Sequence, residues 1–413
     1  MNIVKVDDYQ GPSDDGQWDA DLGHDAGSIQ AVYWRPKKIS STITLLIGTL
    51  SIVALAVLEV APRWQADPHR QTKALANEVA ARCRAEVLQS RTAKGLEVNR
   101  LFDPHRTGVI GKTMTSITSK PANLKAKQIS VHPQFPAIVV ETLLESGVRR
   151  GDTVAVGWTG SFPGLNIALA AAIESLELRV LPIASISASQ YGANEPSLTW
   201  PDMEADLHRA GLIHFRSLAA TIGGPADCGR GMSEEALELA RASAERNDLP
   251  MLQARRLRES IDLRMNLIGD AAKDARIAAY INVGGGVASC GGSDCVFDVG
   301  ASRSQGDPLV DCVMQRFAER DIPVVHLARP LTLAERFGIS DSEESWLASS
   351  VVPAATGPSR LGAGVILILL CLILRAVILK DTATKFGLNV LRFLKRGAVL
   401  RAVGQVEGAQ LMA

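Results

Sequence analysis

The stretch Thr153–Ala172 reads TVAVGWTGSFPGLNIALAAA and combines an apolar run, a turn and a run of small residues. The first part is typical of a buried strand, and the part from Gly164 onward is typical of a helix. Between them lie turn-forming glycines and Pro163, which a helix tolerates in its first turn. The stretch therefore predicts a strand, a turn and a helix, the repeating unit of an α/β fold.

Strand and helix patterns alternate through the rest of this region. Further strands are predicted at 179–187, 277–286 and 322–328, and helices at 135–147, 201–211, 233–247, 250–272 and 308–321. Such alternation indicates βαβ units. We therefore expect an α/β fold, a Rossmann-like domain with a largely parallel sheet, whose ligands bind beyond the carboxyl ends of the strands.

Two long apolar runs flank this region. The first, 39–61, is uncharged up to Glu59, and the second, 361–379, carries only Arg375. Each is close to the ~20 residues that cross a bilayer as a helix. Helices that are apolar on every face are rare in globular domains. We therefore expect two transmembrane helices.

Basic residues set the expected orientation of these spans. They precede the first run and follow the second, at Arg35, Lys37, Lys38, Lys380, Lys385, Arg392, Lys395, Arg396 and Arg401. An excess of Lys and Arg marks the cytoplasmic side of a membrane protein. The expected location is the cytoplasmic (inner) membrane, with both termini in the cytoplasm and the main domain outside.

These features divide the chain into six parts. The acidic tail 1–38 is too poor in apolar residues to fold, and the tail 380–413 mixes basic and apolar residues as an amphipathic helix bound to membrane lipid does. Between them lie a transmembrane helix (39–61), a helix at 71–89 with a connecting segment (62–130), an extracytoplasmic α/β domain (131–358) and a second transmembrane helix (361–379). The helix at 71–89 is expected to rise as a stalk or to pack on the main domain.

Three predicted strand ends carry polar or glycine-rich turns, at 157–164, 187–200 and 284–294. If their strands are parallel, these turns converge, and N–H groups at a helix start can hold a carboxylate or phosphate there. The candidate ligand-binding residues are Thr159, Gly160, Ser161, Asn166, Gln190, Tyr191, Asn194, Gly284, Gly285 and Gly286. In the alternative interpretation, Ser161 only caps the following helix.

Several classes of function are not supported. Lys plus Arg and Asp plus Glu both number 44 and aromatic residues make up 5%, so no nucleic-acid partner is expected. The turn GWTGSFPGLN matches neither a P-loop nor the dinucleotide fingerprint, so no cofactor is expected. It is not a G-x-S-x-G nucleophile elbow, and no His or acid is visibly placed to activate Ser161. Whether the protein is an enzyme stays open.

Cys290 and Cys295 flank a short glycine-rich loop. Because an oxidising exterior permits disulfides, we predict a bridge between them. A zinc site would need further ligands at suitable spacing, and the chain has no paired CxxC or HxxxH motif. No metal site is expected.

The most specific signal is a set of longer motifs. They are GVIGKTMTSITS (108–119), HPQFPAIVVETLLESGVRRGD (132–152), GDTVAVGWTGSFPGLNIALAAA (151–172), SQYGANEPSLTWPDM (189–203) and FRSLAATIGGPADCGRGM (215–232). Through them the chain resembles the accessory membrane protein of bacterial poly-γ-glutamate synthesis systems, over about residues 100 to 335. Trp158 departs from the smaller residue expected at its position.

This resemblance implies partners rather than a reaction. Members of that family are associated with an ATP-dependent ligase that polymerises glutamate at the cytoplasmic face and with small membrane components of the synthase. The expected function is an accessory role in poly-γ-glutamate biosynthesis or export, in which the external domain binds the anionic polymer or its glutamyl carboxylates. No catalytic residue carries over. An external hydrolase or transferase that trims, releases or anchors the polymer, and a scaffold that recruits the synthase, stay open as alternatives.

Overall fold

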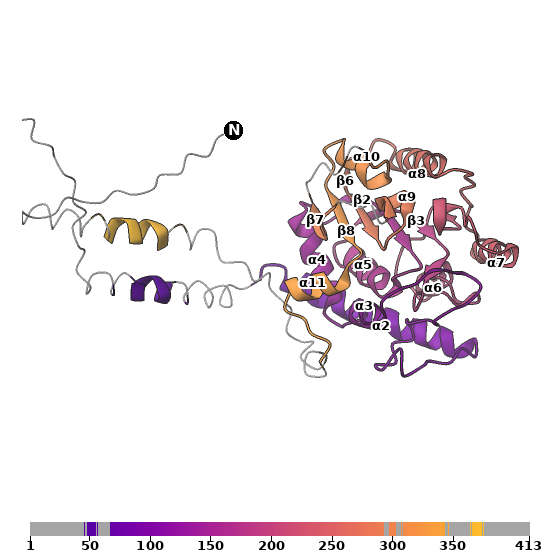
Figure 1. Cartoon of the computed structure of the whole chain (residues 1–413), viewed down its shortest axis with the longest axis horizontal. Helices are drawn as coiled ribbons and strands as arrows, with labels where there is room; N and C mark the ends of the chain where they lie inside the picture. The colour runs from indigo at the N-terminus through magenta and orange to yellow at the C-terminus, as the bar shows by residue number, and fades with distance from the viewer. Residues whose placement is uncertain are drawn as a thin grey trace, which may run out of the picture. The chain divides into compact units, whose positions relative to one another are not determined.

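The computed structural model of the chain describes residues 67–292, 297–302, 307, 309–342 and 346, together with residues 45, 48–54, 56, 364, 366–373 and 375 of the two predicted spans. The residues from 67 to 346 belong to the compact unit Ala56–Ala413 and form the α/β domain of Figure 1. No helix of the described residues is both long and apolar enough to cross a membrane. Much of each predicted span, and both predicted tails (1–38 and 380–413), lie outside them.

A six-stranded sheet forms the centre of the domain. Its strands, in order across the sheet, are β5 (Ala219–Thr221), β3 (Arg179–Ser185), β2 (Thr153–Thr159), β6 (Ile277–Val283), β8 (Val324–Leu327) and β7 (Gly300–Ser302). The first five are parallel, and β7 pairs antiparallel with β8. The predicted α/β fold with a largely parallel sheet is confirmed.

The chain winds in two directions from β2. Strands β3 and β5 lie on one side of it, and β6 and β8 lie on the other, as in doubly wound folds. The order therefore reverses between β2 and β6, which pair in parallel from Val154 opposite Ala279 to Trp158 opposite Val283. The crevice beyond the carboxyl ends of two such strands is where doubly wound sheets bind their ligands.

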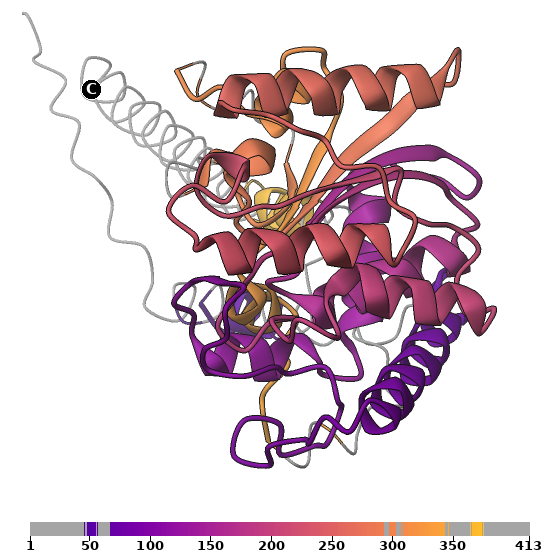
Figure 2. The same ribbon diagram turned by 90° about the vertical axis from the view of Figure 1, so that its right-hand side faces the viewer.

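Both faces of the sheet are covered by helices, because alternate side chains of β2 enter different cores. Val154, Val156 and Trp158 belong to one hydrophobic cluster, and Ala155 belongs to another. The first cluster includes side chains of α2 (Arg70–Ala93), α4 (Phe135–Glu145), α5 (Pro163–Ser175), α6 (Trp200–Arg209) and α11 (Pro330–Arg336), and the second those of α8 (Leu257–Ala272) and α10 (Val313–Ala318). Figures 1 and 2 show the sheet between these two layers.

The helix expected at 71–89 is α2, and it packs on the domain. Its core-facing stripe is fully buried in the first cluster and consists of Ala76, Ala80, Cys83 and Val87. Lys73 adds ion pairs at 2.6 Å to Asp67 and to Glu141 of α4. The chain that follows α2 therefore starts from a fixed position on the domain.

Other elements differ from the sequence pattern in extent. Helix α7 (Glu234–Glu245) starts as predicted after Ser233, whose hydroxyl accepts from the Ala236 N–H. The helix predicted from residue 250 begins only at Leu257, because Met251 forms a parallel bridge with Ala220. Elements without a sequence prediction are α3 (Leu124–Ser130), η2 (Pro225–Asp227), α9 (Val287–Cys290), α11, β5, β7 and a two-stranded parallel ladder of β1 (Thr118–Lys120) and β4 (Ala188–Ser189).

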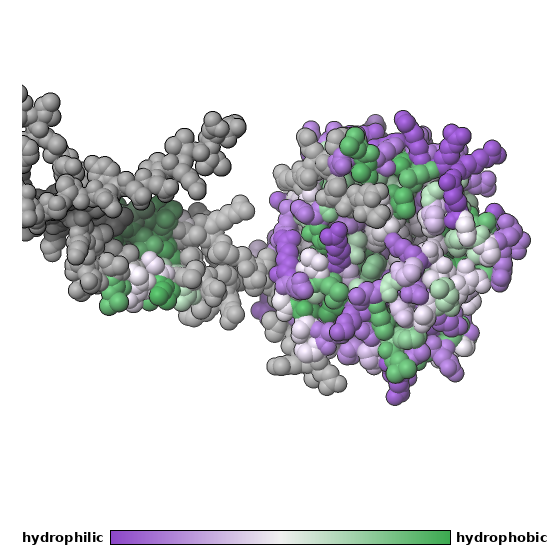
Figure 3. All heavy atoms as spheres, viewed as in Figure 1, coloured by the Kyte–Doolittle hydropathy of each residue, from purple (hydrophilic) through white to green (hydrophobic). Residues whose placement is uncertain are grey.

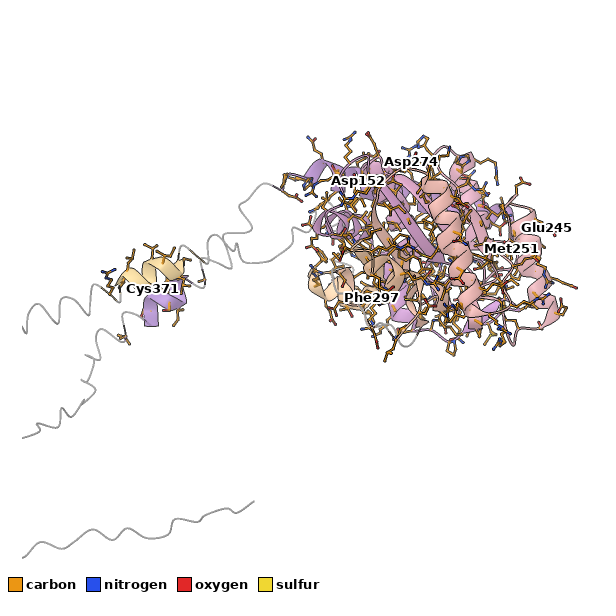
Figure 4. All side chains as sticks on the ribbon, turned by 90° about the horizontal axis from the view of Figure 1, so that it is seen from above. Asp152, Glu245, Met251, Asp274, Phe297 and Cys371 are labelled. Carbon is orange, nitrogen blue, oxygen red and sulfur yellow. The ribbon has the colours of Figure 1, made fainter. Side chains whose placement is uncertain are left out.

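The amino ends of β2 and β6 can be found in Figure 4 by the residues labelled before them. Figure 4 labels Asp152 and Asp274, which precede β2 and β6, near one end of the sheet and Phe297, which follows α9, toward the other.

Figure 3 shows hydrophilic side chains over the visible face of the domain, with hydrophobic ones in small separate patches. In that view the surface favours polar ligands over a large apolar partner.

Candidate functional site

A pocket of about 220 Å³ lies at the carboxyl ends of the central strands. It is lined by residues of β1 and by residues that end or follow β2, β3, β5 and β6, namely Ser119, Lys120, Thr159, Ser161, Ser185, Ser187, Gly223, Gly224, Pro225, Asp227, Gly285, Gly286 and Val287. The pocket therefore occupies the crevice where the strand order reverses. Each of the three turns predicted to converge contributes to this lining.

The lining is rich in hydroxyl groups and poor in bulky side chains. Its polar groups are five Ser or Thr hydroxyls, the exposed Lys120 and the buried Asp227. Glycine lets the turn after β6 approach closely, since Gly284 has φ +91° and a Cβ on it would stand 2.4 Å from Thr159 Oγ1. Hydroxyls and an ammonium group are suited to a small anion.

Two hydrogen bonds, one from a side chain and one from the backbone, hold the turn after β2 in place. Asn166 Nδ2 donates to the Thr159 carbonyl at 2.9 Å, and the Gly160 N–H donates to the Ser185 carbonyl at 3.0 Å. Gly160 and Asn166 therefore support the turn, while Thr159 faces the pocket.

Ser161 also lines the pocket, and its hydroxyl accepts from the Ser189 N–H at 3.1 Å. Phe162 occupies the N-cap position of α5, and no side chain caps that helix. The interpretation of Ser161 as a helix cap is therefore wrong. Its hydroxyl joins the turn to the strand end at Ser189 instead.

Ser187 presents an unused hydroxyl to the pocket. The residue is 3% exposed, and among the described residues its Oγ has no hydrogen-bond partner. The oxygen lies close to Gly223, where a Cβ would stand 2.7 Å from it. Because buried hydroxyls are nearly always paired, this one marks a place for a ligand atom.

Asp227 anchors a buried polar network behind the pocket wall. Its Oδ2 accepts from Ser260 Oγ at 2.6 Å and from two nitrogens of Arg264 at 2.8 and 3.0 Å. Its Oδ1 accepts from Thr221 and Ser185 at 3.0 and 3.3 Å. Asp227 lies at φ +60°, a conformation uncommon for residues other than glycine, and the network holds it there. With five donors around it, the carboxylate fixes the wall rather than binding a ligand.

Lys127 of α3 lies directly behind Ser161. Its ammonium group donates to the Ser161 carbonyl and, at 2.8 Å, to Ser189 Oγ. It also lies 3.8 Å from the centre of the Phe162 ring. Burial and, to a smaller extent, the charge of Lys120 together lower the pKa of Lys127 to about 7.

Six of the ten predicted site residues lie outside the pocket lining: Gly160, Asn166 and Gly284 beside it, and the three residues of the 187–200 loop, Gln190, Tyr191 and Asn194. Asn194 is buried, with its Oδ1 accepting from the Lys112 N–H at 2.9 Å and its Nδ2 donating to the Lys112 carbonyl at 2.7 Å. Gln190 Oε1 accepts a backbone N–H at 3.2 Å, and the Tyr191 ring packs edge-on against Phe102. These contacts fasten the 187–200 loop to the segment before α3.

Trp158, where the sequence resemblance predicts a smaller residue, lies in the core. It is fully buried in the first cluster and packs edge-on against Trp200 at 5.0 Å between ring centres. Its Nε1 donates to Ser217 Oγ at 3.0 Å. The indole therefore does not narrow the pocket.

The cysteine prediction falls partly on residues that the structure does not describe. Cys290 is buried at the end of α9, and Cys295 lies outside the described residues, so the bridge stays a prediction. Within the described part of the chain, no cluster of three or more His, Cys, Asp or Glu side chains is placed to hold a metal ion.

Lys127 and Ser189 together resemble part of a catalytic apparatus. A lysine of lowered pKa beside a serine hydroxyl activates the nucleophile in Ser-Lys enzymes. Both residues, however, are 2% exposed, and neither lines the pocket. The pair is placed to support the turn at Ser161, not to attack a ligand.

A larger hollow of about 520 Å³ opens at the amino ends of β6 and β8. Lys273, Arg276 and Arg320 contribute to its lining, beside the C-terminal ends of α8 and α10. The helix dipole stabilises cations near helix C-termini, so these three cations need no bound ligand to account for their position. Because doubly wound sheets bind ligands at the opposite edge, we assign the candidate site to the smaller pocket.

The sequence analysis did not single out Ser187, Lys127, Asp227 or Arg264 as site residues. Asp227 lies within the motif 215–232, but nothing there marks it as a site residue, and an isolated charged residue such as Lys127 or Arg264 carries no sign that the fold will bury it. The Gly-Gly-Pro turn before Asp227 was the one local feature that could have directed attention there.

No protein-family model matches this chain, and no curated protein matches it. Its function is therefore inferred from the pocket and from the motifs of the sequence.

Proposed function

We propose that this chain is an accessory membrane protein of poly-γ-glutamate biosynthesis or export whose pocket binds a glutamyl carboxylate. The observation that carries this proposal is the unpartnered Ser187 hydroxyl in a pocket lined by hydroxyls and glycines. Carboxylate oxygens accept hydrogen bonds, and the Ser187 hydroxyl can donate one, as can those of Thr159 and Ser161, which accept from backbone N–H groups. Lys120 adds a positive charge at the rim.

The size of the pocket fits one residue of such a polymer. Its volume of about 220 Å³ is below the ~300–1,000 Å³ of sites for drug-sized ligands. The buried pair of Asp227 and Arg264 stands behind one wall. The polymer would therefore present one glutamyl group at a time.

The proposed setting is the outer face of the cytoplasmic membrane. Spans at 39–61 and 361–379 would hold the α/β domain there, with the basic tail 380–413 on the inner lipid surface beside the membrane components of the synthase. The growing polymer would meet the domain as it leaves the membrane. Nucleotides are scarce outside cells, which favours a carboxylate over a nucleotide phosphate.

A binding measurement tests the site. We expect N-acetyl-γ-glutamylglutamate to bind the purified full-length protein in detergent, and Ser187→Ala and Gly285→Val to weaken binding about fivefold or more, since one loses a donor and the other fills the lining. Ser197→Ala, at an exposed serine, is the matched control. Binding that is the same in all four proteins would assign these turns a structural role only.

Deletion of the gene tests the pathway. In a strain that makes poly-γ-glutamate, we expect deletion to reduce secreted polymer strongly, and Ser187→Ala to reduce it partly. Unchanged yield, chain length and surface retention in the deletion strain would contradict the proposal.

The enzymatic alternative makes a different prediction. An external hydrolase or transferase would need the buried Ser189 and Lys127 to be opened to the pocket. A binding protein leaves the length of added polymer unchanged during incubation, whereas shortening or transfer would support the enzyme.

A further inference from the structure

Lys127 is buried with hydrogen-bond acceptors, and among the residues that the structure describes it has no countercharge. Its neighbours are the Ser161 carbonyl, the Ser189 hydroxyl and the face of the Phe162 ring, all of which are neutral. Buried charges in proteins are normally paired, because transfer of an unpaired ion out of water is costly. An unpaired ammonium at this depth therefore requires an explanation.

The charged groups that the structure describes around Lys127 do not compensate its charge. Helices α5 and α11 pack against α3 and carry the charged residues Glu174, Glu335 and Arg336. Glu174 pairs with His214 and Arg336 with Glu145, and none of the three forms an ion pair with Lys127 among the described residues. Within the described part of the chain, the one charge that acts on Lys127 is Lys120 of β1, which has the same sign. The neighbourhood of the pocket is thus positive before a ligand arrives.

We propose that Lys127 is a positioning residue that selects an anionic ligand, and that the bound carboxylate is the countercharge it lacks. The ammonium holds the Ser161 carbonyl, so the Thr159–Ser161 turn keeps its side chains toward the pocket. An anion on the other side of this turn stabilises the charged form of Lys127. Binding is then accompanied by proton uptake from the solvent onto Nζ, by up to one proton per site depending on pH, with no other bond made or broken. This inference rests on the proposed carboxylate ligand.

The direction of the pH dependence follows from the protonation of Lys127 in the protein without ligand. With a pKa lowered to about 7, Lys127 is mostly charged at pH 6 and mostly neutral at pH 8 when no ligand is bound. A bound anion raises that pKa, so affinity is highest below pH 7 and falls by about tenfold between pH 6 and pH 8. Proton uptake follows the opposite course, from about 0.1 proton per site at pH 6 to more than about half a proton at pH 8.

Titration calorimetry of the full-length protein in detergent tests this linkage. The probe is N-acetyl-γ-glutamylglutamate, which has no amine to titrate in this range. Repeating each titration in two buffers of different ionisation enthalpy yields the number of protons taken up. Wild type is expected to show the tenfold change in affinity and the uptake at pH 8.

Three variants separate charge from structure. Lys127→Met is expected to bind about tenfold more weakly than wild type at pH 6, with no proton uptake at pH 8. Lys127→Arg keeps its charge at both values and should retain affinity at pH 8 without uptake. Lys125→Met, at an exposed lysine of the same helix, should match wild type.

The possible failures are distinguishable. If wild type does not bind the probe at either pH, the proposed function is contradicted. If it binds without proton uptake at pH 8, or if uptake persists in Lys127→Met, the role of Lys127 is contradicted and the function stands. Should Lys127→Met fail to fold, the wild-type linkage and the Lys127→Arg variant decide the question.

Discussion

Two cations are buried in contact with residues that line the pocket, and they differ in their partners. Arg264 and Lys127 are both 2% exposed. Arg264 forms an ion pair with Asp227 at 2.8 Å and also donates to Ser185. The partners of Lys127 in the described part of the chain are all neutral. The difference indicates two roles. The neutralised charge of Arg264 holds the pocket wall in place, whereas the uncompensated charge of Lys127 can attract an anionic ligand.

The largest expected effect comes from removing the countercharge of Arg264. Asp227→Asn would leave that guanidinium buried and unpaired, so we expect a loss of about 3–5 kcal/mol in the free energy of unfolding. Urea unfolding monitored by tryptophan fluorescence measures it. The double variant Asp227→Asn with Arg264→Met should recover part of the loss, and a loss below about 1 kcal/mol in the single variant would mean that the pair does not hold the wall.

A third buried ionisable group, Glu204, extends the comparison to a site away from the pocket. The Glu204 carboxyl accepts from Ser217 but has no ion pair among the described residues, and burial raises its pKa to about 7. A raised pKa contributes stability below about pH 4.5 that is lost as pH rises through about 7. Glu204→Gln should therefore stabilise the protein by about 3 kcal/mol at pH 8 and change little at pH 5. Equal effects at both pH values in thermal unfolding would show that the carboxyl is ionised throughout.

The fold was largely predictable from the sequence because it depends on repetition. Strands such as Thr153–Thr159 are buried on both faces, and a run of apolar residues followed by a small-residue helix reveals this without a structure. Short elements were not predictable. Strand β5 has three residues and depends on its neighbours β3 and Met251 for pairing.

The site was predictable only in its glycines and hydroxyls. Thr159, Ser161, Gly285 and Gly286 follow strands, and parallel topology brings them into one pocket. The polar loop at Gln190–Asn194 had an equally suggestive composition, yet its side chains satisfy backbone groups of a distant segment. Such pairings depend on tertiary contacts that no local pattern encodes.

Two serines at the end of β3 sharpen the comparison between wall and ligand site. Ser185 belongs to the Asp227 network, and Ser187 has an unused hydroxyl. Ser185→Ala should cost about 1–2 kcal/mol of stability, because it leaves buried partners unsatisfied. Ser187→Ala should leave stability within about 0.5 kcal/mol and act on ligand affinity instead. Thermal unfolding and probe binding on both variants check this, and the reverse assignment would refute it.

The smallest effect is expected at the rim. Lys120 is exposed and approaches the Gly285 carbonyl at 3.4 Å. Lys120→Met should weaken probe binding about twofold to fivefold in low salt, and the difference should fade at high salt because exposed charges are screened. Calorimetry at two salt concentrations measures it. A difference that persists at high salt would place Lys120 in direct contact with the ligand.

The most direct test of the central claim is a crystal structure of the protein with N-acetyl-γ-glutamylglutamate. We expect a carboxylate oxygen within hydrogen-bond distance of Ser187 Oγ, between the Thr159–Ser161 turn and Gly285–Val287. The probe bound instead at the hollow beside Arg276 and Arg320, or no bound probe at saturating concentration, would contradict the account.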